Sequence, residues 1–138
     1  MAVPYLLDTN ILIAAMKGHD AVRWRLESES LERLRLSAIV LGELEFGAEK
    51  SAYGDRNRAR LATLAHRLPL VGIDHSTTLH YARVRALLER QGMPIGANDT
   101  WIAAQALATG AILVTDNERE FARVPDLPLE NWLAPADR

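Results

Sequence analysis

The sequence predicts an α/β fold in which helices cover both faces of a mainly parallel sheet. Two observations predict it. Short apolar runs of strand length alternate with longer amphipathic segments along the 138 residues. Aspartates follow two of these runs directly, at Asp8 and Asp116, and doubly wound sheets place their sites at the carboxyl ends of the strands. The length is close to the commonest size of one domain, so we expect residues 1–138 to form a single domain.

The first half of the chain is expected to contain two strands and three helices. In chain order these are a strand at 3–8, helices at 10–16 and 19–33, a strand at 35–38 and a helix that includes 39–46. Gly18 is expected to end the first helix, and Ser37 to cap the third. In the charged second helix, Val22, Leu26 and Leu31 are expected to face inward.

The second half is expected to add three helices and three strands. In chain order these are a helix at 55–67, a strand at 69–73, helices at 76–91 and 98–109, a strand at 111–115 and an edge strand within 127–132. Asp55 and Ser76 are the expected N-caps, and Gly92 and Gly110 the expected ends of the later helices. The run AILVT at 111–115 is as apolar as a strand that is buried on both faces.

Four acidic residues fall where this fold brings chain segments together. Asp8 and Asp116 end strands. Glu43 lies about two turns into the helix after the second strand, and Asp99 begins the helix before the last main strand. Carboxylates crowded into one pocket repel one another, so they share protons or hold a hard cation such as Mg²⁺ or Mn²⁺. Short polar groups that can orient them stand nearby, at Thr9, Asn10, Thr115 and Asn117.

Each of the four acidic residues also has a purely structural interpretation. Asp8 suits the N-cap of the helix that follows it, and Asp99 suits the positive end of a helix dipole. Glu43 can face solvent on the shoulder of its helix, and the Thr-Asp-Asn string at Asp116 is also a turn signal. Because no single motif is specific, the functional interpretation depends on the combination.

The amino-acid composition excludes several kinds of catalytic and metal site. The chain has no cysteine, which excludes disulfides, thiolate metal sites and cysteine nucleophiles, and its four histidines are too scattered to indicate an acid–base pair. A net charge of −2 argues against a simple polybasic nucleic-acid binder. The apolar N-terminal stretch lacks a basic leading region and is interrupted by Asp8 and Asn10. We therefore expect no signal peptide and no spanning helix, and a cytoplasmic protein.

Four strings together resemble a known family. They are LLDTNILI (6–13), SAIVLGELEFGAEKS (37–51), GMPIGANDTWIAAQALATGAILVTDN (92–117) and EFARVPDL (120–127). The chain resembles, nearly end to end, the PIN-domain ribonucleases of the VapC toxin type, the toxin halves of bacterial type II toxin–antitoxin pairs. The resemblance implies a PIN-like three-layer α/β/α fold with a central, mainly parallel sheet.

The same resemblance implies a Mg²⁺- or Mn²⁺-dependent endoribonuclease that is neutralised by a cognate VapB-type antitoxin and forms a homodimer. Transfer RNA, cut near the anticodon, is the substrate class it suggests. Carried over by position, the catalytic and metal-binding residues are Asp8, Glu43, Asp99 and Asp116, with Asn10 and Thr115 as supporting polar groups. Relatives vary at the last acidic position. Glu120 is the alternative to Asp116 there, although its place in EREF also suits an ordinary helix surface.

Three other functions fit the residues less well. A dehalogenase-like phosphatase needs a second aspartate two residues after Asp8, where Asn10 stands, and a late lysine, whereas both lysines are early. A receiver-like signalling domain needs an adjacent acidic pair after the first strand and the same late lysine. An inactive interaction module would carry four carboxylates in one cleft at a cost in stability. That last alternative predicts no effect of metal on RNA cleavage or on stability.

The sequence defines the surfaces for substrate and partner less sharply. Candidates for a basic rim that binds RNA phosphates are Arg23 and Arg25, or Arg83, Arg85 and Arg90. Ordinary solvated helix faces are the alternative for each of these arginines. Candidate surfaces for the antitoxin are the segment Leu41–Phe46 and the helix from Val22 to Leu34.

Overall fold

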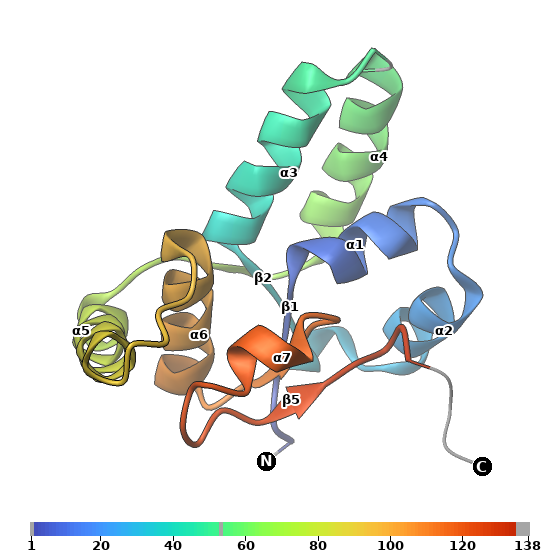
Figure 1. The fold of residues 1–138 in the computed structure, drawn as a ribbon. Coiled ribbons are helices and arrows are strands. Elements are labelled where there is room, and N and C mark those ends of the chain that lie inside the picture. The colour runs from blue at the N-terminus through green and yellow to red at the C-terminus, as the bar shows by residue number, and fades with distance from the viewer. Residues whose placement is uncertain (1, 53, 135–138) are drawn as a thin grey trace.

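The computed structural model describes residues 2–52 and 54–134, and within them the chain forms a five-stranded sheet (Figure 1). The strands lie in the order β3-β2-β1-β4-β5, and every neighbouring pair is parallel. Their bounds are β1 Tyr5–Leu7, β2 Leu34–Ser37, β3 Leu70–Val71, β4 Ile112–Val114 and β5 Leu129–Glu130. The predicted α/β class with a mainly parallel central sheet is confirmed.

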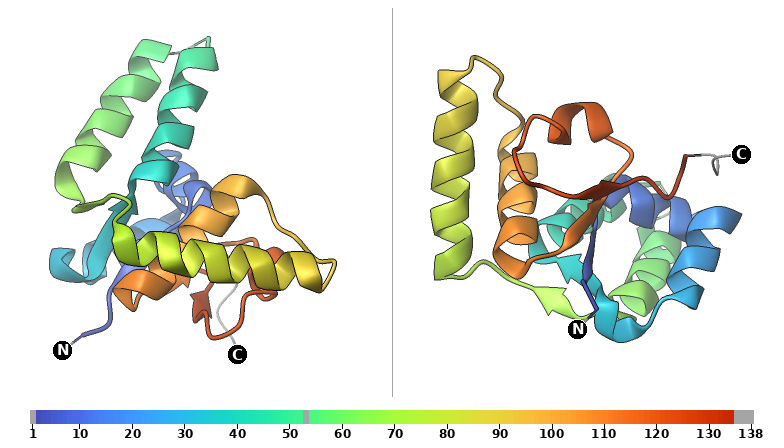
Figure 2. Two further views of the ribbon diagram at one scale, coloured as in Figure 1. Left: turned by 90° about the vertical axis from the view of Figure 1, so that its left-hand side faces the viewer. Right: turned by 90° about the horizontal axis from the view of Figure 1, so that it is seen from below.

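Helices flank this sheet on both sides. Their bounds are α1 Thr9–Met16, α2 Asp20–Ser28, the 3-10 turn η1 Leu31–Arg33, α3 Ala38–Lys50, α4 Gly54–Arg67, α5 His75–Arg90, α6 Ala97–Thr109 and α7 Glu118–Phe121. Helices α5 and α6 lie on one side of the sheet and α1 and α2 on the other, while α3 and α4 form a hairpin that projects beyond it (Figure 1, Figure 2). No helix of the described residues is long and apolar enough to cross a membrane.

The core is centred on β1, all of whose residues are buried. Leu6 and Leu7 are fully buried because helices cover both faces of the sheet, and Ile102 of α6 and Phe121 of α7 are buried in the same cluster. Each such side chain contributes about 1.5–3 kcal/mol by leaving water. The central strand, which ends at Asp8, is therefore firmly anchored.

Several helix ends follow the predicted signals. Ser37 caps α3, since its Oγ accepts hydrogen bonds from the N–H groups of Ile39 and Val40. Gly18 and Gly110 have φ angles of +86° and +66° after α1 and α6. That left-handed conformation strains residues with a Cβ atom, which explains why glycine ends these helices.

Two predicted N-caps are wrong. Helix α5 is capped by Asp74, whose Oδ1 accepts from the N–H of Thr77 at 2.9 Å, so Ser76 lies inside the first turn. Helix α4 begins at Gly54, so Asp55 is a residue of its first turn. At α5, neighbouring polar residues offer more than one capping group, and local propensity alone does not choose between them.

The predicted helix at 19–33 is wrong in its last turn. Helix α2 ends at Ser28 and the chain continues through the 3-10 turn η1. Ser30 accepts a hydrogen bond from the N–H of Glu32, and such local bonds compete with a continuing helix. Leu31, which was expected to face inward, is consequently 48% exposed.

The register of the sheet decides which polar residues meet at its carboxyl edge. Leu7 of β1 lies level with Val114 of β4, and the N–H of Asp8 donates to the carbonyl of Val114 at 2.9 Å. Because these strands are parallel neighbours, the residues that follow them, Asp8 and Thr115, emerge side by side.

Candidate active site

Asp8 occupies the turn between β1 and α1 and is only 7% exposed. Its Oδ1 accepts from the N–H of Thr9 at 2.8 Å as the N-cap of α1, and its Oδ2 accepts from the Oγ1 of Thr115 at 2.7 Å. Burial raises the pKa of Asp8; these two hydrogen bonds oppose the rise, and the charges of Asp116 and Glu120 add to it. The helix cap is thus also a carboxylate fixed at the edge where other acidic residues gather.

Glu43 reaches the same edge from α3. Its Oε1 accepts from the Oγ1 of Thr9 at 3.1 Å, so the residue after Asp8 connects the turn to α3. Burial raises the pKa of Glu43, the hydrogen bond from Thr9 opposes this, and the charge of Asp8 adds to it. Glu43 is therefore a partly buried, partnered carboxylate rather than a solvated residue on a helix shoulder.

Asp99 lies in the first turn of α6 and forms a side-chain hydrogen bond with Glu120 of α7. The pKa of Asp99 is raised to about 6, chiefly by burial and then by the charges of Asp8, Glu120 and Glu43. The pKa of Glu120 is lowered, chiefly by a hydrogen bond from the side chain of Asn117. Because two touching carboxylates do not ionise independently, Asp99 is the member of the pair that takes up a proton as the pH falls through about 6, while Glu120 stays charged.

Glu120 is held by two further hydrogen bonds. Its Oε1 accepts from the N–H of Gly96 at 3.1 Å and its Oε2 from the Nδ2 of Asn117 at 2.8 Å. Sequence analysis did not predict the helix Glu118–Phe121, so Glu120 could not be separated from an ordinary surface residue. A four-residue helix is too short to show a periodic apolar pattern, and the acidic residue itself was the available signal. The structure places that residue against Asp99.

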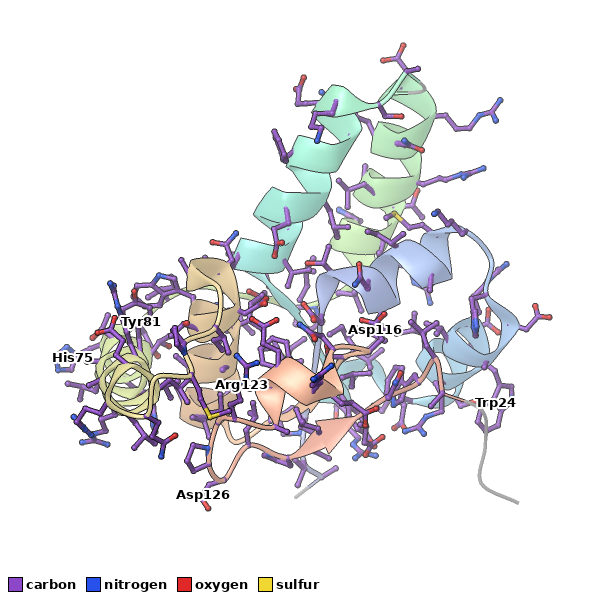
Figure 3. The ribbon with its side chains drawn as sticks, in the orientation of Figure 1. Trp24, His75, Tyr81, Asp116, Arg123 and Asp126 are labelled. Atoms are coloured by element: carbon purple, nitrogen blue, oxygen red, sulfur yellow. The ribbon has the colours of Figure 1, made fainter. Side chains whose placement is uncertain are left out.

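Asp116 lies at the exposed rim of this group. Its Oδ1 accepts from the Nδ2 of Asn10 at 3.2 Å, and Figure 3 shows it between α1 and α7. The structure therefore joins Asn10 and Asp116, which the sequence had singled out separately. The other acidic residues around it are partly or fully buried.

The acidic cluster is defined here as Asp8, Glu43, Asp99, Asp116 and Glu120. Its carboxylate oxygens are the hard ligands that Mg²⁺ and Mn²⁺ prefer. The pKa values of Asp8, Glu43 and Asp99 are raised chiefly by burial and in part by the charges of other members of the cluster, and a cation would relieve that repulsion. Within the described residues, no three acidic or histidine side chains stand close enough to ligate one ion together. An ion held here would therefore have to keep part of its water shell, as Mg²⁺ does.

A buried polar bridge fixes the two helices that carry Glu43 and Asp99. Gln105 of α6 is fully buried, and its Oε1 accepts from the Oγ of Ser37, the N-cap of α3. Its Nε2 donates to the backbone carbonyls of Val71 and Gly72 at 3.2 Å each. Sequence analysis missed this bridge because a glutamine inside an apolar helix carries no sign of its partners. The bridge sets the position of α3 relative to α6.

The sequence and the fold of this chain are similar to those of known proteins. The family model for the PIN domain matches residues 5–127. Ribonuclease VapC2 from Rickettsia felis is 40% identical over 130 residues, which cover 93% of this chain and 97% of the relative. The tRNA(fMet)-specific endonuclease VapC from Shigella flexneri is 40% identical over 129 residues, with 93% and 97% covered. The structure of VapBC2 from Rickettsia felis bound to a promoter DNA fragment contains a similar chain, with a TM-score of 0.88, 38% identity and coverage of 94% of this chain and 99% of that one.

The raised pKa of Asp99 predicts a pH-dependent gain from Asp99→Asn. The folded pKa of about 6 exceeds the ordinary 3.8, so the stability that protonated Asp99 contributes is present below 3.8 and lost as pH rises through 6. An asparagine amide donates to Glu120 at every pH. In EDTA at pH 7.5 (about 1.5 above that pKa) we expect the Tm of Asp99→Asn to exceed that of the wild type by about 3 °C, after discounting for partial exposure. This gain should vanish near pH 4 (about the ordinary pKa).

Differential scanning fluorimetry in EDTA and in Mn²⁺ measures this effect. Mn²⁺ should raise the Tm of the wild type more than that of Asp99→Asn, because the variant has lost a carboxylate ligand. Asp126→Asn is the matched control, since Asp126 lies outside the acidic cluster at a positive φ that asparagine accepts. Equal pH profiles for Asp99→Asn and Asp126→Asn would contradict the prediction.

The buried bridge predicts a large loss of stability for Gln105→Leu. The substitution keeps the side-chain volume but leaves the Ser37 hydroxyl and two backbone carbonyls without their amide partner. We expect the free energy of unfolding to fall by about 2 kcal/mol, measured by urea denaturation. Gln91→Leu, at an exposed position after α5, should change it by less than about 0.5 kcal/mol. Equal stability of the two variants would show that the bridge contributes nothing.

Proposed function

The chain belongs to the PIN-domain family, in which its relatives are VapC ribonucleases, and we propose that it is a metal-dependent endoribonuclease of the VapC toxin type. It hydrolyses RNA phosphodiester bonds and is neutralised by a cognate VapB-type antitoxin. The observation that carries this proposal is the convergence of the acidic cluster at the carboxyl edge of the parallel sheet. Clusters of this kind serve phosphodiester hydrolysis by holding divalent metal.

The proposed metal-binding residues are Asp8, Asp99 and Glu43, with Asp116 or Glu120 as the last, and they would hold the ion directly or through its bound water. Bound Mg²⁺ or Mn²⁺ would supply neutralisation of the phosphate charge and polarisation of its oxygens. Among these groups Glu120 is the better supported last ligand, because it touches Asp99 and is ionised, whereas Asp116 lies at the exposed rim.

The side chains around the metal ligands have distinct tasks in this proposal. The hydroxyl of Thr115 keeps Oδ2 of Asp8 from rotating away, since the two atoms are joined by a short hydrogen bond. One carboxylate oxygen of Glu43 accepts the hydrogen bond from Thr9, and within the described residues the second oxygen accepts none. With a raised pKa, Glu43 is suited to take a proton from the attacking water. The expected products carry a 5′-phosphate and a 3′-hydroxyl.

Transfer RNA, cut near the anticodon, is the proposed substrate class. The support is the 40% identical relative from Shigella flexneri, which is named a tRNA(fMet)-specific endonuclease. The proposal also includes a homodimer and a cytoplasmic location, as the family resemblance implies.

The proposed seat of the antitoxin is a groove between α1, α2 and α4 with a volume of about 450 Å³. We call it the α2 groove. Its apolar floor consists of Met16, Leu26, Leu31, Leu34, Leu64 and Leu68, and the basic residues at its rim are Lys17, Arg23, Arg60 and Arg67. Glu27 is the acidic residue at this rim. An apolar antitoxin segment flanked by acidic residues therefore fits it. Of the two predicted surfaces, Val22–Leu34 supplies part of this groove and Leu41–Phe46 does not.

The first prediction from this function concerns cleavage of a total transfer-RNA pool by antitoxin-free protein. The wild type should produce discrete fragments with Mg²⁺ or Mn²⁺ and none with EDTA. Asp8→Asn and Asp99→Asn should each lower the cleavage rate by about 10²-fold or more, because each removes charge from the metal-binding cluster. Gel analysis of end-labelled RNA measures the rates.

Two further variants separate the candidates for the last ligand. If Glu120 is the last ligand, Glu120→Gln should lower the cleavage rate more than Asp116→Asn does. The opposite order would indicate that Asp116 is the ligand. Asp126→Asn serves as the control for loss of one surface carboxylate. Fragments that persist in Asp8→Asn and Asp99→Asn would belong to a contaminant. A wild type with neither cleavage nor a metal-induced thermal shift would be an inactive interaction module.

The α2 groove predicts which exposed leucine the antitoxin needs. Leu31→Glu should weaken binding of the cognate antitoxin by about 10-fold or more, since it places a charge on the apolar floor. Leu79→Glu on α5 is the matched control, because Leu79 is 47% exposed against 48% for Leu31 and lies outside the groove. Calorimetric titration measures both affinities. Equal affinities of the two variants would indicate that the antitoxin binds another surface.

A further inference from the structure

A second, smaller groove opens directly on the acidic cluster. It has a volume of about 270 Å³ and lies between α1, α3 and α4. Glu43 is one of its lining residues, and the apolar ones include Ile13, Met16, Leu44, Ala48 and Leu61. We call it the Glu43 groove. Glu43 belongs both to this groove and to the acidic cluster, so the groove begins beside the cluster.

Two cations line the Glu43 groove, Lys17 just after α1 and Arg60 on α4. Glu43 is bonded to Thr9 at the beginning of α1, and the eight residues of α1 span about 12 Å. The groove therefore has a carboxylate of the acidic cluster near the beginning of α1 and a lysine at its end, a separation on the scale of a dinucleotide.

Within the part of the chain that the structure describes, neither cation has a side-chain partner. Across residues 2–52 and 54–134, the side chains of Lys17 and Arg60 form no ion pair and no hydrogen bond. Two other basic residues on these faces are paired, Arg23 with Glu27 and Arg58 with Glu49. Two unpaired cations beside an apolar floor are the lining expected for a ligand that is part apolar ring and part phosphate.

We propose that the Glu43 groove is an RNA subsite that holds the nucleotide next to the bond that is cut. The base lies on the apolar floor, and Lys17 and Arg60 bind a phosphate that neighbours the scissile one. This inference depends on the endoribonuclease function proposed above, because that function puts the scissile phosphate at Glu43. RNA fits better than a peptide, since the site combines cations for phosphate with direct access to the acidic cluster.

The predicted basic rims are less suited to this task. Arg25 is tied to Glu29 and Glu130 and lies over the ring of Trp132, so it ties α2 to β5 and the segment after it. Arg85 is paired with Glu89 on α5. The α5 arginines line neither groove. Lys17, which sequence analysis noted only as one of two lysines, is the cation that lines both grooves with Arg60.

The two grooves share Met16, Lys17 and Arg60. An antitoxin segment seated in the α2 groove therefore lies against the same two cations that the RNA subsite uses. Binding of antitoxin and of RNA at these cations is then mutually exclusive.

Lys17→Ala and Arg60→Ala test the subsite, with Arg56→Ala as the matched control. Arg56 is exposed on α4, about one turn before Arg60, and lines neither groove. In an Asp8→Asn background, which removes cleavage, the affinity for a fluorescent single-stranded RNA is measured by anisotropy across a salt series. We expect each test variant to bind about tenfold more weakly and to lower the salt slope by about 0.7. In the active protein, KM for a cleaved transfer RNA should rise about tenfold while kcat stays within twofold.

The outcomes separate the subsite from the proposed function. Loss of RNA affinity in the test variants but not in Arg56→Ala supports the subsite, whether or not the active protein cleaves RNA. Unchanged affinity and salt slope overturn it, even if the wild type cleaves. Weaker antitoxin binding with unchanged RNA binding also overturns it, and assigns Lys17 and Arg60 to the antitoxin alone. A fall in kcat without a change in KM would contradict a binding role.

Discussion

Repulsion among carboxylates at one edge of the sheet is the constraint that the rest of this structure accommodates. Asp8 cannot move away from it, because it ends a central strand whose leucines are buried on both faces. Asp99 approaches from α6 and Glu120 from α7, and the pKa of Asp99 rises to about 6, chiefly through burial and then through the charges of Asp8, Glu120 and Glu43. Without a cation, protonation of Asp99 relieves this repulsion only as the pH falls through about 6, and above that pH the repulsion persists.

The surrounding fold supplies compensating positive potential and donors. Asp8 caps α1 and Asp99 lies in the first turn of α6, where helix dipoles favour negative charge. The hydroxyls of Thr9 and Thr115 donate to Glu43 and Asp8. None of these donors carries a formal charge, so they moderate the repulsion without neutralising it. The repulsion is therefore set by the backbone itself, through the parallel register of β1 and β4 and the helix starts that follow.

The sequence allowed the parts of the site that depend on local pattern to be predicted. Asp8 and Asp116 follow apolar strands and Ser37 precedes an apolar helix. The predicted topology therefore placed all three at the carboxyl edge of the sheet, where the structure has them. The contacts between distant segments were not predictable in this way. Gln105 contacts Ser37 and the carbonyl of Val71 only once the chain has folded. Glu120 contacts Asp99 only because the four-residue helix α7 carries it there. Competing caps at Asp74 and Ser76 show the same limit, because their propensities are similar and packing decides.

The chain has a net charge of −2, but its negative and positive charges gather at different places, the acidic cluster and the pair Lys17 and Arg60. This separation connects the proposed catalysis with its inhibition by the antitoxin. The acidic cluster repels RNA unless a cation is present, so attraction of the substrate must come from elsewhere on the surface. In the proposed subsite Lys17 and Arg60 supply it from the same groove as Glu43, and neither has an acidic partner among the described residues. These residues also line the groove proposed for the antitoxin. A partner that covers them blocks the approach of RNA without any need to reach the proposed metal ligands, so inhibition acts on substrate binding rather than on the groups that would hold the metal.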